Sequence, residues 1–284
     1  MGEIKAFLFT INKLPFANRK DDFGFVKEAF EKNNVEIVEI KHLPEEERSF
    51  VVISGSDLAG KEKEVSRELN NIKKVVLFIT SDELGIFDIE KISHPDIKIW
   101  KQYPNETHFK FFRMPLGAPK TMHLDVPKYS QKKNDIFFAG QVTHPRRGEL
   151  VEALNSMEVK NYLGTKGFMQ GEHRSVYYKK MSEAKVVPAP AGHPSIDSFR
   201  FYEAIEMLAI PIGDLKDSQD RYFDIWTSIF VTNIPFPTTD NWNNLPKIMK
   251  NILSKYPNNM HQLVAWWIKY KRDFANKIME QINE

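Results

Sequence analysis

The chain has 284 residues, of which 42% are hydrophobic and 27% are charged, and this composition excludes a wholly disordered protein. Its 40 lysines and arginines nearly balance its 38 aspartates and glutamates, which excludes a surface coated in basic charge but allows a local basic groove. The absence of cysteine excludes disulfides, zinc–cysteine sites and a thiol nucleophile. No stretch reaches about 18 uninterrupted apolar residues, so we expect no membrane span and a cytoplasmic location.

The first 115 residues alternate apolar runs with amphipathic segments. They predict a strand at 4–11, a helix at 22–33, strands at 35–40 and 50–55, a helix at 62–72, and strands at 73–80, 97–100 and 109–115. Apolar strands that alternate with helices indicate a parallel sheet covered on both faces. We therefore expect an N-terminal Rossmann-like domain at 1–115.

Residues 116–134 show no apolar period and contain Pro119 and Pro127, which predicts an interdomain linker. The alternation then resumes. It predicts strands at 135–140, 159–164, 185–190, 209–213 and 228–236, with helices at 144–154, 172–184, 198–208, 243–255 and 259–282. Two similar α/β halves followed by a helical tail are the layout of two facing Rossmann-like domains.

The stretch "AGHPSIDSFRFYEAI" (191–205) joins a predicted strand to a predicted helix, where ligands collect in doubly wound sheets. Asp197 or Ser198 can cap this helix, whose N-terminus attracts anions. Arg200 lies in the first turn, and Glu203 lies three residues later on the same face. The pair fits a ligand that carries both an anion and a diol. An ordinary surface ion pair is the alternative.

The stretch "FFAGQVTHPRRGEL" (137–150) repeats this arrangement of strand, glycine, loop and helix. Gly140 allows backbone to approach a ligand, and Arg146 or Arg147 can bind phosphate with two hydrogen bonds. Solvated charge at a helix start is the alternative. Neither GxGxxG nor GxxxxGK[ST] occurs, so the patterns of dinucleotide-binding and P-loop proteins are absent.

Three segments, "DIFFAGQVTHPRR", "YYKKMSEAKVVPAPAGHPSIDSFRFYEAIEMLAIPIG" and "IPFPTTDNW", resemble the nucleotide-sugar domain of exostosin-like glycosyltransferases over about residues 135–245. The resemblance implies a GT-B enzyme with a donor domain at 135–258 and a final helix, 259–284, that crosses back to an acceptor domain at 1–115. The sequence departs from the family at 207–209, where the family usually has a small Ala-Gly turn, and in lacking the family's cysteines and membrane anchor.

By position, the resemblance implies that Glu203 binds the ribose of a nucleotide sugar and Arg200 its diphosphate, with Arg146 or Arg147 assisting. Gly192 and Ser198 would shape the loop. The donor is expected to be UDP-linked. The enzymes that this chain resembles generally work without a metal, and the sequence shows no metal-ligand spacing, so we expect neither metal nor separate cofactor.

The acceptor hydroxyl needs a base for glycosyl transfer with inversion. Asp82 and Glu83 follow the apolar strand 73–80 and are our candidates, whereas Asp21 and Asp22 form a second acidic pair. Either pair can equally cap a helix or be solvated. The acceptor is open: a glycan, a small molecule or a hydroxymethylated base in DNA. A non-catalytic nucleotide-binding protein with the same fold is the further alternative.

Overall fold

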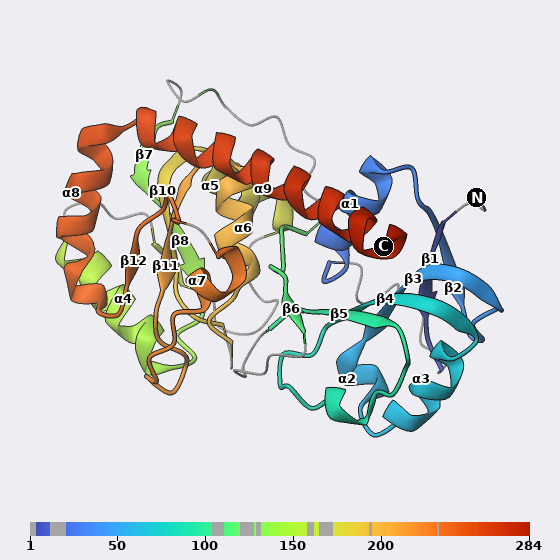
Figure 1. The fold of residues 1–284 in the computed structure, drawn as a ribbon. Coiled ribbons are helices and arrows are strands. Elements are labelled where there is room, and N and C mark those ends of the chain that lie inside the picture. The colour runs from blue at the N-terminus through green and yellow to red at the C-terminus, as the bar shows by residue number, and fades with distance from the viewer. Residues whose placement is uncertain are drawn as a thin grey trace. The chain divides into compact units, whose positions relative to one another are not determined.

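The computed structural model describes residues 4–11, 21–103, 111–119, 128, 132–157, 162–164, 173–192, 195–231 and 233–284. The chain forms two compact units (Figure 1). Unit 1 comprises Met1–Lys120 and Lys269–Glu284, and unit 2 comprises Thr121–Ile268. The first division falls within the predicted linker 116–134, most of which lies outside the described residues.

Unit 1 contains a six-stranded parallel sheet in the order β2-β1-β3-β4-β5-β6. Its strands are β1 (Lys5–Phe9), β2 (Glu36–Ile40), β3 (Glu46–Ser54), β4 (Ile72–Thr80), β5 (Ile97–Lys101) and β6 (Phe112–Arg113), and its helices are α1 (Gly24–Lys32), α2 (Gly55–Leu58), α3 (Glu62–Leu69) and the 3-10 turn η2 (Ile89–Lys91). Because β1 lies between β2 and β3, the strand order reverses there, as in doubly wound folds.

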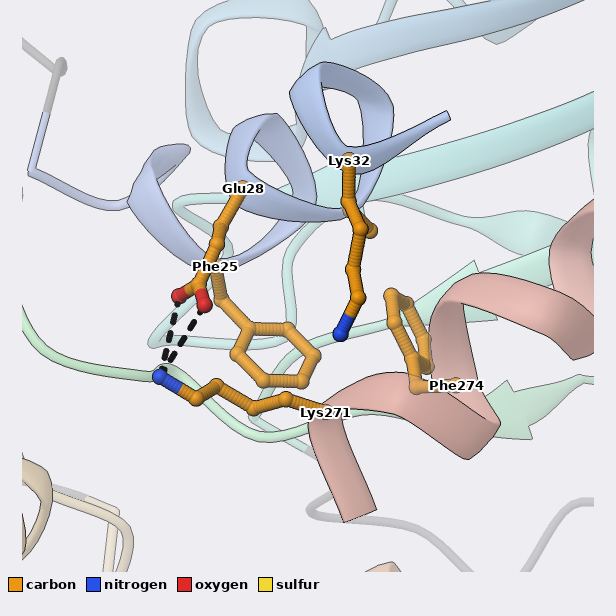
Figure 2. A pocket seen from close by; sticks show the side chains of 6 residues that line it. Phe25, Glu28, Lys32, Lys271 and Phe274 are labelled. Carbon is orange, nitrogen blue, oxygen red and sulfur yellow. Dashed lines mark hydrogen bonds and ion pairs between the residues drawn. The ribbon is translucent and has the colours of Figure 1, made fainter. Parts of the chain in front are cut away.

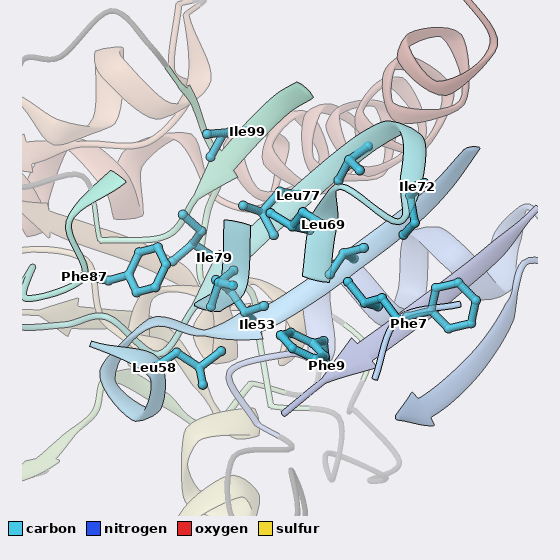
Figure 3. Packing of buried hydrophobic residues seen from close by; sticks show 14 residues of the cluster. Phe7, Phe9, Ile53, Leu58, Leu69, Ile72, Leu77, Ile79, Phe87 and Ile99 are labelled. Atoms are coloured by element: carbon cyan, nitrogen blue, oxygen red, sulfur yellow. The ribbon is translucent and has the colours of Figure 1, made fainter. Parts of the chain in front are cut away.

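Alternate residues of the central strands point to opposite faces of the unit 1 sheet, and both sets of side chains are buried. Val51 and Leu77 belong to the apolar cluster that also holds residues of α2 and α3 (Figure 3). On the other face, Phe30 of α1 packs on Phe50 and Phe78 with ring centroids 5.0 and 5.5 Å apart. The continuous apolar strands of the sequence are thus explained by helices on both sides.

Unit 2 has a parallel sheet in the order β12-β11-β10-β7 and a separate parallel pair, β8-β9. Its elements are β7 (Asn134–Ile136), β8 (Phe138–Gly140), α4 (Pro145–Ser156), β9 (Tyr162–Gly164), α5 (Arg174–Ser182), β10 (Ala184–Ala189), α6 (Phe199–Glu206), β11 (Ile210–Asp214), α7 (Ile225–Phe230), β12 (Thr238–Thr239), η4 (Trp242–Asn244) and α8 (Leu245–Lys255).

The predicted strand at 228–236 is wrong, because the apolar run begins inside helix α7. The Asp224 side chain accepts a hydrogen bond from the Thr227 N–H and caps this helix. The Trp226 ring stacks on Phe201 with centroids 4.2 Å apart. Residues 228–230 of the run are therefore helical and their helix packs against α6, an arrangement that apolar content alone does not distinguish from a strand.

The last helix, α9 (Asn258–Asn283), contributes to both units, because its residues up to Ile268 belong to unit 2 and those from Lys269 belong to unit 1. Within unit 2, the Trp267 Nε1 donates to the Glu206 carboxylate at 2.7 Å. Within unit 1, the Phe274 ring lies 4.7 Å from that of Phe25. Among the described residues, neither this helix nor any other is long and apolar enough to cross a membrane.

Candidate functional site

The carboxyl edge of the unit 2 sheet gathers most of the residues that the sequence singled out. Strands β10 and β11 of this sheet end there, the end of β8 from the separate pair lies against it through Arg200, and helices α4 and α6 begin there. In open α/β sheets this edge is where ligands bind, because loops and helix N-termini converge on it.

Arg200, in the first turn of α6, lies against the end of β8. Its Nη2 donates to the Ala139 carbonyl at 2.8 Å, and its guanidinium carbon lies 4.9 Å from the centre of the Phe138 ring. A β-carbon at Gly140 would lie 3.0 Å from Arg200 Nη2, so a larger residue there would require this guanidinium to shift. The predicted approach of a ligand to the Gly140 backbone stays a prediction.

Glu203 is buried, with 7% of its surface exposed, so the alternative of an exposed surface ion pair is wrong. The Tyr177 hydroxyl donates to its Oε2 at 3.0 Å and the Tyr178 hydroxyl to its Oε1 at 2.9 Å. Burial raises the pKa of Glu203 above its ordinary value, while the charge of Arg200 and the tyrosine hydroxyls oppose that rise. The pKa values of both tyrosines are raised, first by burial and then by the Glu203 charge.

Arg147, in the first turn of α4, completes a basic pair with Arg200. Its Nη1 donates to the Gln141 carbonyl at 3.2 Å, and its Nε donates to the Ala191 carbonyl at 3.4 Å. Burial and then the positive charge of Arg200 lower the pKa of Arg147 to about 10. This mutual repulsion means that the two guanidinium groups favour an anion between or beside them.

Arg146 has a different environment, and the structure favours Arg147 over it as the assisting arginine. Its side chain is 1% exposed. Its Nη2 donates to Asp214 at 2.7 Å and its Nη1 to Glu149 at 2.6 Å. A buried guanidinium that already binds two carboxylates is neutralised within the protein, so Arg146 has a structural role at the edge of the sheet.

Asp214, the last residue of β11, was not singled out from the sequence and joins several parts of this edge. Its Oδ2 accepts hydrogen bonds from the Ala191 N–H and from Trp242 Nε1, both at 3.2 Å. Its backbone carbonyl accepts from Trp226 Nε1 at 2.7 Å. Burial raises the pKa of Asp214, and the hydrogen bond from Arg146 opposes the rise. No spacing pattern marks this residue, because a lone acid at a strand end is common.

Ser198 precedes α6 and has an extended backbone, with φ −144° and ψ 145°, but its side chain makes no capping hydrogen bond. Its Oγ is buried and has no hydrogen-bond partner among the described residues, and the same holds for Arg200 Nε. Buried polar atoms without hydrogen-bond partners are uncommon in folded proteins, and here two of them lie at one helix N-terminus. Gly192 is half-buried in the same loop, and the two residues that follow it lie outside the described residues.

In unit 1, the predicted catalytic pair divides into two environments. Asp82 is fully buried, and its Oδ2 lies 2.9 Å from Lys101 Nζ. Its Oδ1 accepts from the Ile86 and Phe87 N–H groups at 2.9 and 3.3 Å. These contacts make Asp82 the anchor of the loop after β4 and leave it no access to an acceptor hydroxyl. Glu83 is half-buried and stays a prediction.

Asp22 and the histidines, whose side chains can also accept a proton, are less suited to act as the base. Asp22 accepts a hydrogen bond from Ser81 Oγ, and its backbone carbonyl accepts from Gln102 Nε2 at 2.8 Å. His144 is 8% exposed and its Nε2 lies 3.0 Å from the Ala191 carbonyl. His108 and His193 lie outside the described residues. Within the described ranges, no group of three histidines, aspartates or glutamates is placed to hold a metal.

Each unit has a cavity that is lined by described residues. A small one in unit 1, of about 10 Å³, lies between α1 and α9 (Figure 2). Figure 2 shows Lys271 reaching Glu28, at 3.0 Å, beside the rings of Phe25 and Phe274. Such a cavity holds at most one water molecule. The larger one, of about 330 Å³, lies in unit 2 and is lined by Arg146, Glu149, Lys216, Asp240, Asn241 and Asn243.

Comparisons with known protein families and with curated proteins found no match. Among solved structures, an alpha-glucosyltransferase in complex with UDP-glucose and DNA containing an abasic site is similar over 99% of each chain, with 10% identity and a TM-score of 0.53. An alpha1,3-fucosyltransferase matches over 92% of this chain and 81% of its own, with 13% identity and a TM-score of 0.48. A structure of an alpha1,3-fucosyltransferase with GDP matches over 92% of this chain and 81% of its own, with 12% identity and a TM-score of 0.47.

The likeness to the glucosyltransferase extends over nearly the whole of both chains. Together with a parallel α/β sheet in each unit, it gives this chain the GT-B fold, as predicted from the sequence. At this level of identity the likeness concerns architecture only, and the exostosin-like resemblance stays a prediction.

Proposed function

We propose that this chain is a glycosyltransferase that moves a sugar from a nucleotide diphosphate sugar, UDP-linked, to an acceptor hydroxyl. The observation that carries the proposal is the basic pair Arg147 and Arg200 at the carboxyl edge of the unit 2 sheet, where Arg200 Nε and Ser198 Oγ have no partner among the described residues. The GT-B fold supports it by analogy.

The basic pair suits a diphosphate. Arginine donates two parallel hydrogen bonds to phosphate oxygens, and the N-terminus of α6 adds N–H groups that point the same way. Burial, and after it the charge of Arg200, lowers the pKa of Arg147, and an anion between the two guanidinium groups would offset that repulsion. Two guanidinium groups also supply the positive charge for the departing diphosphate, so we expect transfer without a divalent metal.

Glu203 would bind the ribose in this proposal. Each of its oxygens accepts one tyrosine hydroxyl, and a carboxylate has about four acceptor positions, so acceptor capacity is left for a diol. Tyr177 and Tyr178 fix the carboxylate in place before a ligand enters. The carboxylate is thus positioned rather than mobile.

The chemical step needs a base that takes the proton of the acceptor hydroxyl. The acceptor oxygen then bonds to the anomeric carbon as the bond from that carbon to the diphosphate breaks, and the nucleoside diphosphate leaves with the electron pair. Glu83 is the proposed base, because the Asp82 carboxylate is buried and already binds Lys101 and the backbone of the loop after β4.

A hydroxyl on modified DNA is the second candidate acceptor. It is favoured by the solved glucosyltransferase, which was determined with UDP-glucose and DNA containing an abasic site. A DNA-binding enzyme should bind duplex DNA with an affinity that falls steeply as salt rises. Undetectable duplex binding at low salt would leave a glycan or a small molecule as the acceptor.

The first experiment is a calorimetric titration of UDP, GDP, ADP and TDP into the protein. We expect UDP to bind tightest, and Glu203→Ala to raise its dissociation constant about tenfold or more, as for a lost charged hydrogen bond of about 1.5–3 kcal/mol. Unchanged UDP affinity in a folded Glu203→Ala variant contradicts the ribose role. Release of UDP from a UDP-sugar, with and without a chelator, then separates an enzyme from a non-catalytic binder and tests the metal-free expectation.

A further inference from the structure

Lys132 belongs to the predicted linker 116–134, where a lysine would ordinarily lie in solvent. The structure buries it instead, with only 7% of its surface exposed. Its Nζ donates to the Ser182 carbonyl at 2.5 Å and to the Met207 carbonyl at 2.6 Å. Lysine is almost never buried unless its charge has partners, so these two carbonyls account for its position.

Both of these carbonyls lie at helix ends. Ser182 is the last residue of α5, and Met207 is the C-cap of α6. The last carbonyls of a helix have no partner within the helix and carry the negative end of its dipole, so a cation is favoured there. One ammonium group therefore binds the C-terminal ends of two helices and joins them.

The same two helices carry the contact that fixes the proposed ribose-binding carboxylate. One turn before its last residue, α5 carries Tyr178, and one turn before its C-cap, α6 carries Glu203. The Tyr178 hydroxyl donates to Glu203 Oε1 at 2.9 Å. The Met207 N–H donates to the Glu203 carbonyl at 2.9 Å, so the α6 backbone stays helical between them. On each helix, one turn therefore separates the lysine contact from the tyrosine–carboxylate contact.

Apolar side chains fill the space between these helices. Tyr178 and Met181 of α5 and Ala204 and Met207 of α6 belong to one buried cluster. Apolar burial is not directional, whereas a hydrogen bond requires a particular distance and direction. Lys132 therefore adds to this packing a fixed position of α5 along α6.

The other end of α6 is held separately. Arg200, in the first turn, donates to the Ala139 carbonyl at 2.8 Å, and its guanidinium lies against the Phe138 ring. A change at the C-terminal end of α6 should therefore affect Glu203, which is one turn away, more than Arg200, which is two turns away. Ligands with and without a ribose distinguish the two effects.

We infer that Lys132 is a positioning residue of the nucleotide site. By binding the ends of α5 and α6, it keeps Tyr178 within hydrogen-bonding distance of Glu203 and so holds the carboxylate in place for a ribose. The inference rests on the proposed function for the identity of the ligand. It gives a residue of the predicted linker a role in binding.

The test compares Lys132→Met with a matched control, Lys133→Met. Lys133 is the next residue and has the same charge, but its side chain is 72% exposed and pairs with Glu183 at 3.1 Å. Calorimetry measures the dissociation constants of UDP, which has a ribose, and of inorganic diphosphate, which has none. Each variant is measured well below its unfolding temperature, so that a loss of stability alone leaves the affinities unchanged.

We expect Lys132→Met to weaken UDP about three- to fivefold, as for one lost hydrogen bond, and to leave inorganic diphosphate unchanged. Lys133→Met should change neither. Tyr178→Phe should weaken UDP similarly, and adding Lys132→Met to it should have no further effect, because both changes act through the same contact. Equal weakening of the two ligands, additive effects in the double variant or unchanged UDP affinity would overturn the inference.

A second variant covers the case in which Lys132→Met does not fold. Lys132→Gln keeps a hydrogen-bond donor on a shorter side chain. It is measured with the same ligands and in the same combination with Tyr178→Phe, and the same outcomes support or overturn the inference.

Failure of the proposed function gives a different result. If the wild-type protein binds neither UDP nor inorganic diphosphate, the proposed function fails, and positioning is tested in the ligand-free protein by nitration with tetranitromethane. This reagent attacks ionised phenols. Burial and then the Glu203 charge raise the pKa of Tyr178, so Tyr178 should react slowly in the wild type.

Lys132→Met should speed the nitration of Tyr178 but not that of Tyr202, which is buried on α6 with its ring 5.6 Å from that of Trp267. Peptide mass spectrometry separates the two tyrosines. Such a result would support the positioning of Glu203 without a nucleotide. Faster nitration of both tyrosines, or of neither, would contradict it.

Discussion

Arg146 and Arg147 are neighbours in the sequence, yet their guanidinium groups bind different kinds of partner. Arg146 donates to the carboxylates of Asp214 and Glu149, whereas Arg147 donates to the backbone carbonyls of Gln141 and Ala191. Consecutive residues of a helix point about 100° apart, which separates the two side chains. One arginine is neutralised by carboxylates inside the protein, whereas the hydrogen bonds of the other go to uncharged carbonyl groups.

Arg146→Ala should destabilise the protein far more than Arg147→Ala. Removing Arg146 leaves the Asp214 carboxylate buried without its charged partner, which typically costs about 3–5 kcal/mol. Arg147→Ala removes two hydrogen bonds to carbonyls and relieves repulsion from Arg200, so its effect should be small. Urea unfolding of both variants measures the difference. The assignment of roles is wrong if Arg147→Ala proves the more damaging change.

Arg147→Gln and Arg200→Gln should each weaken UDP binding about tenfold or more, because each removes a charged hydrogen bond of about 1.5–3 kcal/mol. The salt dependence of binding should also become shallower, since one cation fewer meets the diphosphate. Calorimetry at two salt concentrations provides both values. Arg221→Gln is the matched control, because Arg221 is 69% exposed and pairs with Asp217 on the surface. An equal loss in the control would show a general charge effect.

Glu203→Gln should change how stability depends on pH. Burial raises the pKa of Glu203 above 4.5, so the folded state keeps this proton to a higher pH than the unfolded state. The free energy of unfolding of the wild type therefore falls as pH rises from about 4.5 through the folded pKa. Glutamine does not titrate, so the variant lacks this fall. Urea unfolding from pH 4.5 upward tests it, and parallel curves for the two proteins would contradict the raised pKa.

Lys132 gives a second pH effect, with the opposite trend. Its Nζ donates to the Ser182 and Met207 carbonyls, at 2.5 and 2.6 Å, near the ends of α5 and α6. Burial lowers its pKa from 10.5 to about 8, so the unfolded state binds this proton more strongly. The free energy of unfolding should therefore rise between about pH 8 and 10.5.

Lys132→Met should remove this rise. The variant also leaves the two carbonyls without a donor from residue 132, at a cost of about 1–3 kcal/mol that does not depend on pH. Chemical unfolding at pH 7.5, 9 and 10 separates the constant loss from the pH-dependent part. An unchanged slope in Lys132→Met would assign any alkaline stabilisation to other groups.

Strand and helix order in unit 1 followed from the sequence because its strands are long and apolar on both faces. The predicted strand 73–80 and the observed β4, Ile72–Thr80, differ by one residue. The predicted strand 135–140 was less complete, since the structure divides it at Phe137 into β7 and β8, which belong to different sheets. The division arises because β7 pairs with β10 and β8 pairs with β9. The apolar pattern of residues 135–140 is continuous and does not indicate it.

The candidate site was predictable in position but not in detail. A glycine at a strand end and an arginine in a first helical turn indicated Gly140, Arg147 and Arg200, and the structure brings Arg200 against Gly140 and its charge close enough to act on Arg147. The burial of Glu203 beneath two tyrosines was not foreseen, because Tyr177 and Tyr178 lie on a different helix, 26 and 25 residues away. Tertiary packing determines which side chains are buried and which partners they bind. The spacing of residues within one segment does not predict contacts between two helices.

Asp214 has a consequence for natural variation. It accepts hydrogen bonds from Arg146, from the Ala191 N–H and from Trp242, so one carboxylate joins the start of α4, the segment after β10 and η4. A substitution that moves this carboxylate is therefore felt at all three places. In related chains, positions 146, 214 and 242 should change together or not at all.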